Sequence, residues 1–125
     1  MTGVINVRVA HLREMGYNSL SQWLEADCNH LYIGRDSRYI KGAKSNKWEN
    51  PYPVIGNSEQ SRIDCINRFK RRAVINLWDC LEELDGKTLG CWCKPQKCHG
   101  DVLIDLLKSK NNGMTQEECI KSLPQ

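Results

Sequence analysis

The segment "LGCWCKPQKCHGDVLIDLL", residues 89–107, contains an apolar run, a short polar stretch and a second run with apolar residues at helical spacing. Residues 87–93 predict a strand and residues 99–110 predict a helix, with "KPQK" as the loop between them. Within nine positions this strand–loop–helix unit holds three cysteines and one histidine: Cys91, Cys93, Cys98 and His99. We therefore expect the unit both to organise the fold and to contribute to a site.

Two further strands are predicted upstream. Residues 3–9, "GVINVRV", alternate apolar and polar side chains, and residues 30–35, "HLYIGR", form a second β-rich run. Between them, residues 18–26 show a short helical pattern. Strands that alternate with helices predict an α/β fold, a small Rossmann-like three-layer sandwich with a short, largely parallel sheet. The length favours a single α/β domain over residues 1–125.

The C-terminal half is predicted to be helical. An apolar stripe from Ile63 to Leu84, at spacings of three and four, indicates one long helix with room for a kink. Thr115 and Glu118 form a capping-box pattern for a last short helix. Helix caps are expected at Asn18 or Ser19, Ser58 or Ser61, and Thr115. Residues 36–57 lack periodicity, and so long a connection in a compact domain is uncommon and often functional.

The composition is that of an ordinary globular chain that stays inside a cell. Of its 125 residues, 40% are hydrophobic and 26% are charged, with no apolar stretch near the ~20 residues of a membrane helix. Arg8 and Arg13 interrupt the N-terminal apolar run, which excludes a signal-peptide plan. Seven cysteines, an odd number, argue against a secreted disulfide scaffold. We expect a cytoplasmic protein with free or metal-bound thiols and no membrane partner.

The net charge of +3 is mild, but the basic residues are clustered. One cluster lies in residues 35–47, and a second lies on the predicted long helix: Arg68, Lys70, Arg71 and Arg72. Such clusters attract phosphates, although a solvated face is the more frequent explanation of a charge run. One hypothesis is therefore an interaction protein that uses the second cluster to bind nucleic acid, with a strong dependence on salt.

The cysteine–histidine segment permits a metal site. Thiolate and imidazole groups suit zinc, and four ligands would close a tetrahedral site: Cys91, Cys93, Cys98 and His99. Their spacing differs from that of zinc ribbons and knuckles. Cys28 and His30 are further candidates that would complete a three-ligand set.

The same segment permits catalysis or anion binding. Cys98 would begin the predicted helix, where aligned backbone dipoles lower a thiol pKa, so it is a candidate nucleophile. His99 would then shuttle a proton, and Asp101 would orient the imidazole or cap the helix. Alternatively, Gly100 would let a phosphate approach the helix start, with Arg35 and Arg62 binding the same oxygens. Simple packing is the remaining explanation, and we assign it to Cys65, Cys80, Cys119 and Trp92.

The chain resembles a family from phages, large DNA viruses and bacteria that is known only as a domain of unknown function. Its signature is C-W-C-x-P-x-x-C-H-G-D-V-L, which residues 91–103 match throughout. Two further family motifs resemble Tyr32–Arg35 and Asn50–Gly56, although Pro53 follows Tyr52 in this chain. The resemblance spans roughly residues 30–107. It implies a small α/β domain acting inside a host cell, with one site drawn from Arg35, Asn50, Pro51, Arg62, Cys98, His99 and Asp101.

The leading hypothesis is a phosphate-bearing ligand, a nucleotide or nucleic acid, bound at a Cys/His/Arg site and altered there by hydrolysis or group transfer. In it, Arg35 and Arg62 hold phosphate and Asn50 bonds a base or sugar, while Cys98, His99 and Asp101 perform the chemistry. The alternative is a non-catalytic binding module that zinc stabilises. The sequence leaves open whether the chain is an enzyme.

Overall fold

The computed structural model describes residues 2–53, 55–56, 58–94 and 96–123. The strands are β1 (Gly3–Asn6), β2 (His30–Tyr32) and β3 (Thr88–Cys91); the helices are α1 (Val9–Glu14), α2 (Leu20–Ala26), α3 (Glu59–Asn76), the 3₁₀ helix η1 (Trp78–Leu84), α4 (His99–Asn111) and α5 (Gln116–Lys121). Two positions of the motifs quoted above, Val54 and Pro95, lie outside the described residues, as does Asn57 at the end of the predicted loop.

The three strands form one parallel sheet in the order β1-β3-β2. Ile5 and Tyr32 both pair with Gly90, so β3 is the central strand. All three strands therefore end at the same edge of the sheet, where the carboxyl ends of β2 and β3 lie side by side. The predicted α/β class and parallel sheet are confirmed.

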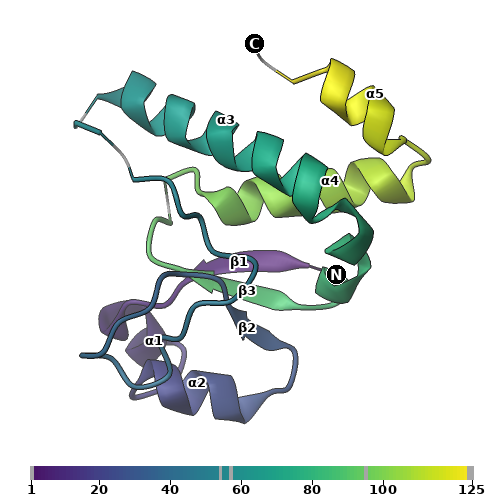
Figure 1. Cartoon of the computed structure of the whole chain (residues 1–125). Coiled ribbons are helices and arrows are strands. Elements are labelled where there is room, and N and C mark those ends of the chain that lie inside the picture. Colours follow the sequence, from purple (N-terminus) through teal and green to yellow (C-terminus); the bar gives the residue numbers. More distant parts are fainter. Residues whose placement is uncertain (1, 54, 57, 95, 124–125) are drawn as a thin grey trace.

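Helices cover both faces of the sheet (Figure 1). In the sheet β3 lies between β1 and β2, so the connection from β1 to β2 skips one strand position. The connection from β2 to β3 then runs back toward β1. Because parallel crossovers are right-handed, this reversal directs α1 and α2 to one face and α3 to the other. The hydrophobic core therefore consists of two clusters. One contains Phe69, Leu89 and Leu103, and the other contains Leu12, Trp23 and Tyr32.

Two glycines allow helices to lie close to the sheet. A Cβ atom on Gly90 would come within 2.6 Å of Val7 and 2.9 Å of the Trp23 ring. A Cβ atom on Gly100, in the first turn of α4, would meet Ile33 at 2.9 Å and Val4 at 3.0 Å. Gly100 thus serves the packing of α4 onto the sheet, and its Cα faces the sheet rather than a ligand.

Most predicted caps are confirmed. The Ser19, Ser58 and Thr115 side chains accept backbone N–H groups at the starts of α2, α3 and α5. Thr115 and Glu118 form the predicted capping box. Short polar side chains that precede an apolar stripe therefore located these helix starts correctly.

Four predicted elements differ from the structure in their bounds. The strands predicted for residues 30–35 and 87–93 are shorter, ending at Tyr32 and Cys91, and the other two differences have a visible cause. The predicted strand 3–9 ends at Asn6, because the Asn6 side-chain oxygen accepts the Arg8 N–H at 2.8 Å and turns the chain into α1. The predicted long helix ends at Asn76 and continues as η1, where Cys80 donates to the Leu77 carbonyl in the tighter 3₁₀ pattern. Both helix types bury residues spaced three or four apart, so the stripe could not distinguish them.

Among the described residues, no helix combines the length and the apolar character that crossing a membrane requires. The longest helix is α3, whose sequence alternates apolar residues with charged ones.

Candidate functional site

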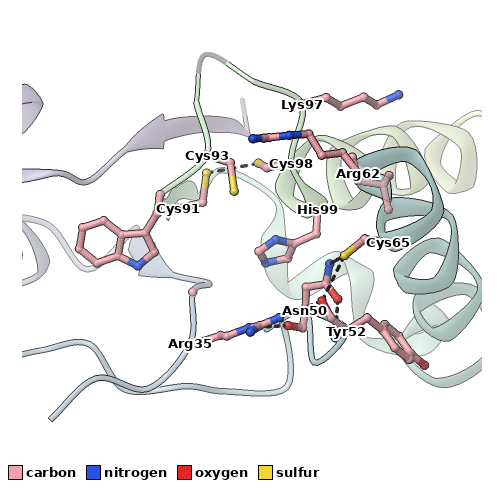
Figure 2. A pocket seen from close by; sticks show the side chains of 13 residues that line it. Arg35, Asn50, Tyr52, Arg62, Cys65, Cys91, Cys93, Lys97, Cys98 and His99 are labelled. Carbon is pink, nitrogen blue, oxygen red and sulfur yellow. Dashed lines mark hydrogen bonds between the residues drawn. The ribbon is translucent and has the colours of Figure 1, made fainter. Parts of the chain in front are cut away.

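A cavity of about 310 Å³ opens at the carboxyl ends of β2 and β3, beside the starts of α3 and α4 (Figure 2). Its lining comes from four separate segments of the chain: Gly34, Arg35, Asn50, Tyr52, Arg62, Cys65, Ile66, Cys91, Trp92, Cys93, Lys97, Cys98 and His99. The cavity therefore lies where ligands bind in open parallel sheets, beyond the carboxyl ends of the strands.

Seven of the predicted site residues line this cavity: Arg35, Asn50, Arg62, Cys91, Cys93, Cys98 and His99. Three others are not part of the lining: Gly100 and Asp101 lie in the first turn of α4, and Pro51 lies in the loop between Asn50 and Tyr52. The predicted meeting of the two strand ends is thus present in the structure.

A pair of thiols forms one wall of the cavity. Cys91 ends β3 and Cys98 caps α4, and their Sγ atoms lie 3.2 Å apart. The pKa of Cys91 is lowered to about 7, chiefly because the Cys98 thiol donates to the Cys91 thiolate, with help from the Cys93 and Lys94 backbone. The negative neighbour and burial raise the pKa of Cys98. The helix start was predicted to favour a Cys98 thiolate, and the lowered pKa of Cys91 adds a second candidate for the thiolate in the same pair.

Two backbone N–H groups at the start of α4, those of Cys98 and Asp101, are hydrogen-bonded within the protein. Cys98 takes the serine-like position of a capping box, so its Sγ accepts the Asp101 N–H. The Asp101 carboxylate accepts the Cys98 N–H at 3.0 Å and pairs with Lys94 at 2.5 Å. Asp101 therefore caps the helix, which was one of the two roles predicted for it, and it makes no hydrogen bond to His99 in the part of the chain described.

The imidazole of His99 is buried and held by the backbone. Its Nε2 lies 2.8 Å from the Ile33 carbonyl oxygen, so Nε2 donates and carries the proton. The Phe69 ring meets the imidazole edge to face at 5.0 Å. Burial lowers the pKa of His99, and the positive charge of Arg35 lowers it further. Hydrogen bonds to backbone carbonyls raise the pKa but do not offset these effects. His99 is thus a neutral imidazole at pH 7, suited to accept a proton at Nδ1.

The loop that closes the cavity is clamped from two sides. Arg35 donates from Nε to the Asn50 carbonyl (3.1 Å) and from Nη2 to the Tyr52 carbonyl (2.8 Å), and the Cys65 thiol of α3 donates to the same Tyr52 oxygen (3.1 Å). The Asn50 side chain accepts the Tyr52 N–H at 2.9 Å and donates to Cys65 Sγ at 3.4 Å. These contacts, several of them drawn in Figure 2, join two of the motif segments, at Arg35 and at Asn50–Tyr52, to helix α3.

The charged groups of the cavity are all positive. Arg35, Arg62 and Lys97 line it, and no aspartate or glutamate does so among the described residues. Arg62 donates to the side-chain oxygen of Gln96. None of the three cations forms an ion pair with a carboxylate in the described ranges. An anionic ligand would therefore meet cations without competing carboxylates.

The predicted zinc ligands do not form a metal-binding group in this structure. Over the residues described, no three cysteine, histidine, aspartate or glutamate side chains are arranged to hold a metal ion. His99 Nε2 faces the Ile33 carbonyl. The extra candidates Cys28 and His30 belong to the opposite edge of the sheet, because His30 begins β2, where it pairs with Thr88 at the start of β3.

Four lining residues with functional side chains were not predicted as part of the site: Tyr52, Cys65, Trp92 and Lys97. Cys65 was assigned to packing, although it follows Arg62 by one helical turn and so faces the same cavity. Tyr52 was noted only within a family motif, and Lys97 only within the loop "KPQK". Trp92, assigned to the core, is half-buried and borders the cavity, with its indole N–H donating to Tyr32. The helical spacing from Arg62 was the only signal in the sequence that pointed to Cys65.

The second basic cluster lies on α3 outside the cavity. Arg68 and Arg71 are exposed, whereas Lys70 and Arg72 are half-buried. None of the four residues lines the cavity. The nucleic-acid hypothesis based on this cluster therefore concerns a surface separate from the cysteine–histidine site.

Comparison with known proteins gives one family and two relatives. A family model described as "Domain of unknown function (DUF4326)" matches residues 18–109. "Uncharacterized protein R718" of Acanthamoeba polyphaga mimivirus is 36% identical over 89 residues, which cover 62% of this chain and 66%, just under two thirds, of that protein. The "Uncharacterized 12.4 kDa protein in nrdA-td intergenic region" of Enterobacteria phage T4 is 30% identical over 108 residues, 73% of this chain and 97% of that protein. No solved structure was found to match.

These findings confirm the resemblance to a family of unknown function with phage and viral members. The match begins earlier than the motifs suggested, at residue 18 instead of about residue 30. The match contains both clamps of the cavity loop and the whole thiol pair.

Proposed function

We propose that this chain, which belongs to the DUF4326 family, binds a phosphate-bearing ligand in the cavity and acts on it by hydrolysis or group transfer. The observation that carries the proposal is the lining itself: three cations and no described carboxylate surround a thiol pair and a neutral imidazole. We favour a nucleotide, free or at an accessible position of a nucleic acid. This retains the Rossmann-like interpretation of the sheet, in which the ligand lies beyond the strand ends.

Charge and size support this choice of ligand. Arg62 and Lys97 have exposed side chains at the mouth, and a guanidinium has the fork geometry that phosphate oxygens prefer. A volume of about 310 Å³ lies at the lower end of the ~300–1,000 Å³ range for small-molecule sites. One nucleotide unit therefore suits the cavity better than a length of strand. Trp92 and Tyr52 supply aromatic surface of the kind on which bases stack.

Each predicted role can be assigned to an available atom. Arg35 uses Nε and Nη2 to clamp the loop, which leaves the other N–H groups of its guanidinium for a phosphate. Asn50 uses one amide hydrogen toward Cys65, which leaves the second for a base or sugar. Arg62 is the principal phosphate ligand in this proposal.

The chemistry proposed for the site is nucleophilic or acid–base. A Cys91 thiolate, supported by Cys98, is the nucleophile or the base that activates water. His99 receives a proton at Nδ1 while Nε2 remains bonded to the Ile33 carbonyl. Asp101 takes a positioning role, since its carboxylate holds the Cys98 backbone at the helix start.

Calorimetric titration with nucleoside monophosphates, the matching nucleosides and inorganic phosphate tests the binding. We expect the phosphorylated compounds to bind and the nucleosides to bind at least about tenfold more weakly, because the cations contact only the phosphate. Arg62→Gln should weaken binding by a similar factor. Arg71→Gln, which removes the same charge from an exposed position of α3 outside the cavity, is the matched control and should bind normally.

Product analysis after incubation with the ligand that binds tests the reaction. Turnover should be lost in Cys91→Ser and retained in Cys28→Ser, an exposed cysteine at the other edge of the sheet. Equal binding of nucleoside and nucleotide, or equal loss in Arg62→Gln and Arg71→Gln, would contradict the proposed ligand. Turnover by Cys91→Ser at the wild-type rate would contradict the proposed chemistry.

A further inference from the structure

The two thiols at the cavity wall have a second chemical capacity. We propose that Cys91 and Cys98 form a redox-active dithiol, which the disulfide of a small thiol oxidises to an intramolecular disulfide. This activity goes beyond the proposed function and does not rest on it, because disulfide exchange needs neither a phosphate nor the arginines.

Geometry carries the proposal. The two Sγ atoms are 3.2 Å apart, and both cysteines are free. They are anchored on adjacent but separate elements, the end of β3 and the cap of α4. A disulfide bond is about 2.05 Å long, so its formation requires the two sulfurs to move about 1 Å closer together. The chain between them spans residues 92–97, so the bond would close a short loop at the mouth of the cavity.

The surroundings favour exchange with a small disulfide over a protein disulfide. Cys91 and Cys98 are 1% and 2% exposed, but both line the cavity. A reagent must therefore enter a space of about 310 Å³ to reach them. The Cys98 thiol and the Cys93 and Lys94 backbone stabilise a thiolate on Cys91, and the thiolate is the form that attacks disulfides.

The exchange has two balanced steps. The Cys91 thiolate attacks one sulfur of the small disulfide, which forms a mixed disulfide and releases one small thiolate. Cys98 passes its proton to that thiolate, attacks Cys91 Sγ and releases the second small thiolate. The protein pair gives up two electrons and the disulfide is reduced to two thiols. A dithiol reagent reverses the reaction.

Peptide mapping after treatment with hydroxyethyl disulfide tests the proposal. Trypsin cleaves after Lys97 and so separates the peptide 88–97, with Cys91 and Cys93, from the peptide 98–108, with Cys98. In Cys93→Ser, whose first peptide keeps only Cys91, we expect the two peptides to become cross-linked in the folded protein. Formation should be at least about tenfold faster than in the same chain unfolded in urea, because the fold holds the sulfurs together. Dithiothreitol should restore both thiols.

The control variants separate the possible outcomes. In the Cys93→Ser background, adding Cys28→Ser should leave the cross-link unchanged, and adding Cys91→Ser should abolish it. A folded Cys93→Ser protein that forms no cross-link, or forms it no faster than the unfolded chain, would overturn the proposal. The readout is covalent and needs no phosphate ligand, so its failure leaves nucleotide binding by the reduced protein untouched, and the reverse also holds.

Discussion

At the scale of single residues, the account depends on how Cys91 and Cys98 share one proton. Two thiols at 3.2 Å cannot both ionise readily, since the second charge would repel the first. The Cys98 thiol thereby acts as a donor that holds the thiolate on Cys91. The lowered pKa of Cys91 therefore has a local cause, its contact with the Cys98 thiol.

Removal of the donor should change the pH dependence of thiol reactivity. Carbamidomethylation of Cys91 by iodoacetamide, followed by peptide mass spectrometry, should rise with pH through about 7 in a Cys93→Ser background. In the Cys98→Ala variant the midpoint should move upward by at least about one pH unit, because the thiolate loses its principal hydrogen bond. A midpoint that stays near 7 without Cys98 would contradict the shared proton.

His99 should make the protein less stable in acid. Burial lowers its folded pKa, so between that value and the ordinary pKa of about 6.5 the unfolded chain binds a proton that the folded chain does not. Above about pH 6.5, His99 therefore does not make the stability depend on pH. Below about pH 6.5 the free energy of unfolding falls, by up to about 1.4 kcal/mol per pH unit. Urea unfolding at pH 7 and 5.5 measures this loss. His99→Gln, which retains an amide donor for the Ile33 carbonyl, should lose less stability over the same interval than the wild type. An equal loss in both proteins would exclude His99 as the source.

At the scale of elements, the central strand tolerates only the smallest residue where helix α2 crosses it. Gly90→Ala would drive a methyl group to 2.6 Å from Val7 and 2.9 Å from Trp23, both fully buried. We expect a loss of about 1–3 kcal/mol in urea unfolding, as for other overpacked cores. Gly3→Ala, on strand β1 with no atom within 4 Å of the added carbon, is the matched control and should be close to neutral. Equal stability of the two variants would mean that the sheet and α2 are less closely packed than described.

The loop clamp makes a second prediction at this scale. Arg35→Ala removes two hydrogen bonds to the Asn50 and Tyr52 carbonyls, so the segment around these residues should be cleaved faster in limited proteolysis. Arg38→Ala serves as control, because within the described residues the Arg38 guanidinium hydrogen-bonds only to the neighbouring Tyr39. Cleavage at the same rate in both variants would show that Arg35 does not hold the loop.

At the scale of the whole molecule, the sequence predicted the parts of the fold that depend on local patterns. The helix starts were predicted from capping residues, namely Ser19, Ser58 and Thr115. The alternation of strands and helices predicted the parallel sheet and the edge at which the cavity opens. Contacts between residues far apart in the sequence could not be predicted. The position of Cys65 on the Tyr52 carbonyl depends on how α3 crosses the loop, which no spacing in the sequence encodes. The turn at Asn6 that begins α1 was not predicted, because β-branched residues continue past Asn6 and extend the strand pattern.

The central claim is that a phosphate-bearing ligand occupies the cavity at the strand ends. A titration of ¹⁵N-labelled protein with a nucleoside monophosphate, followed by two-dimensional NMR, tests it most directly. The account predicts the largest shifts at Arg62, Lys97 and the backbone around Cys98, with α1 and α5 unchanged. Shifts confined to Arg68 and Arg71 on the outer face of α3, or none at all, would contradict it.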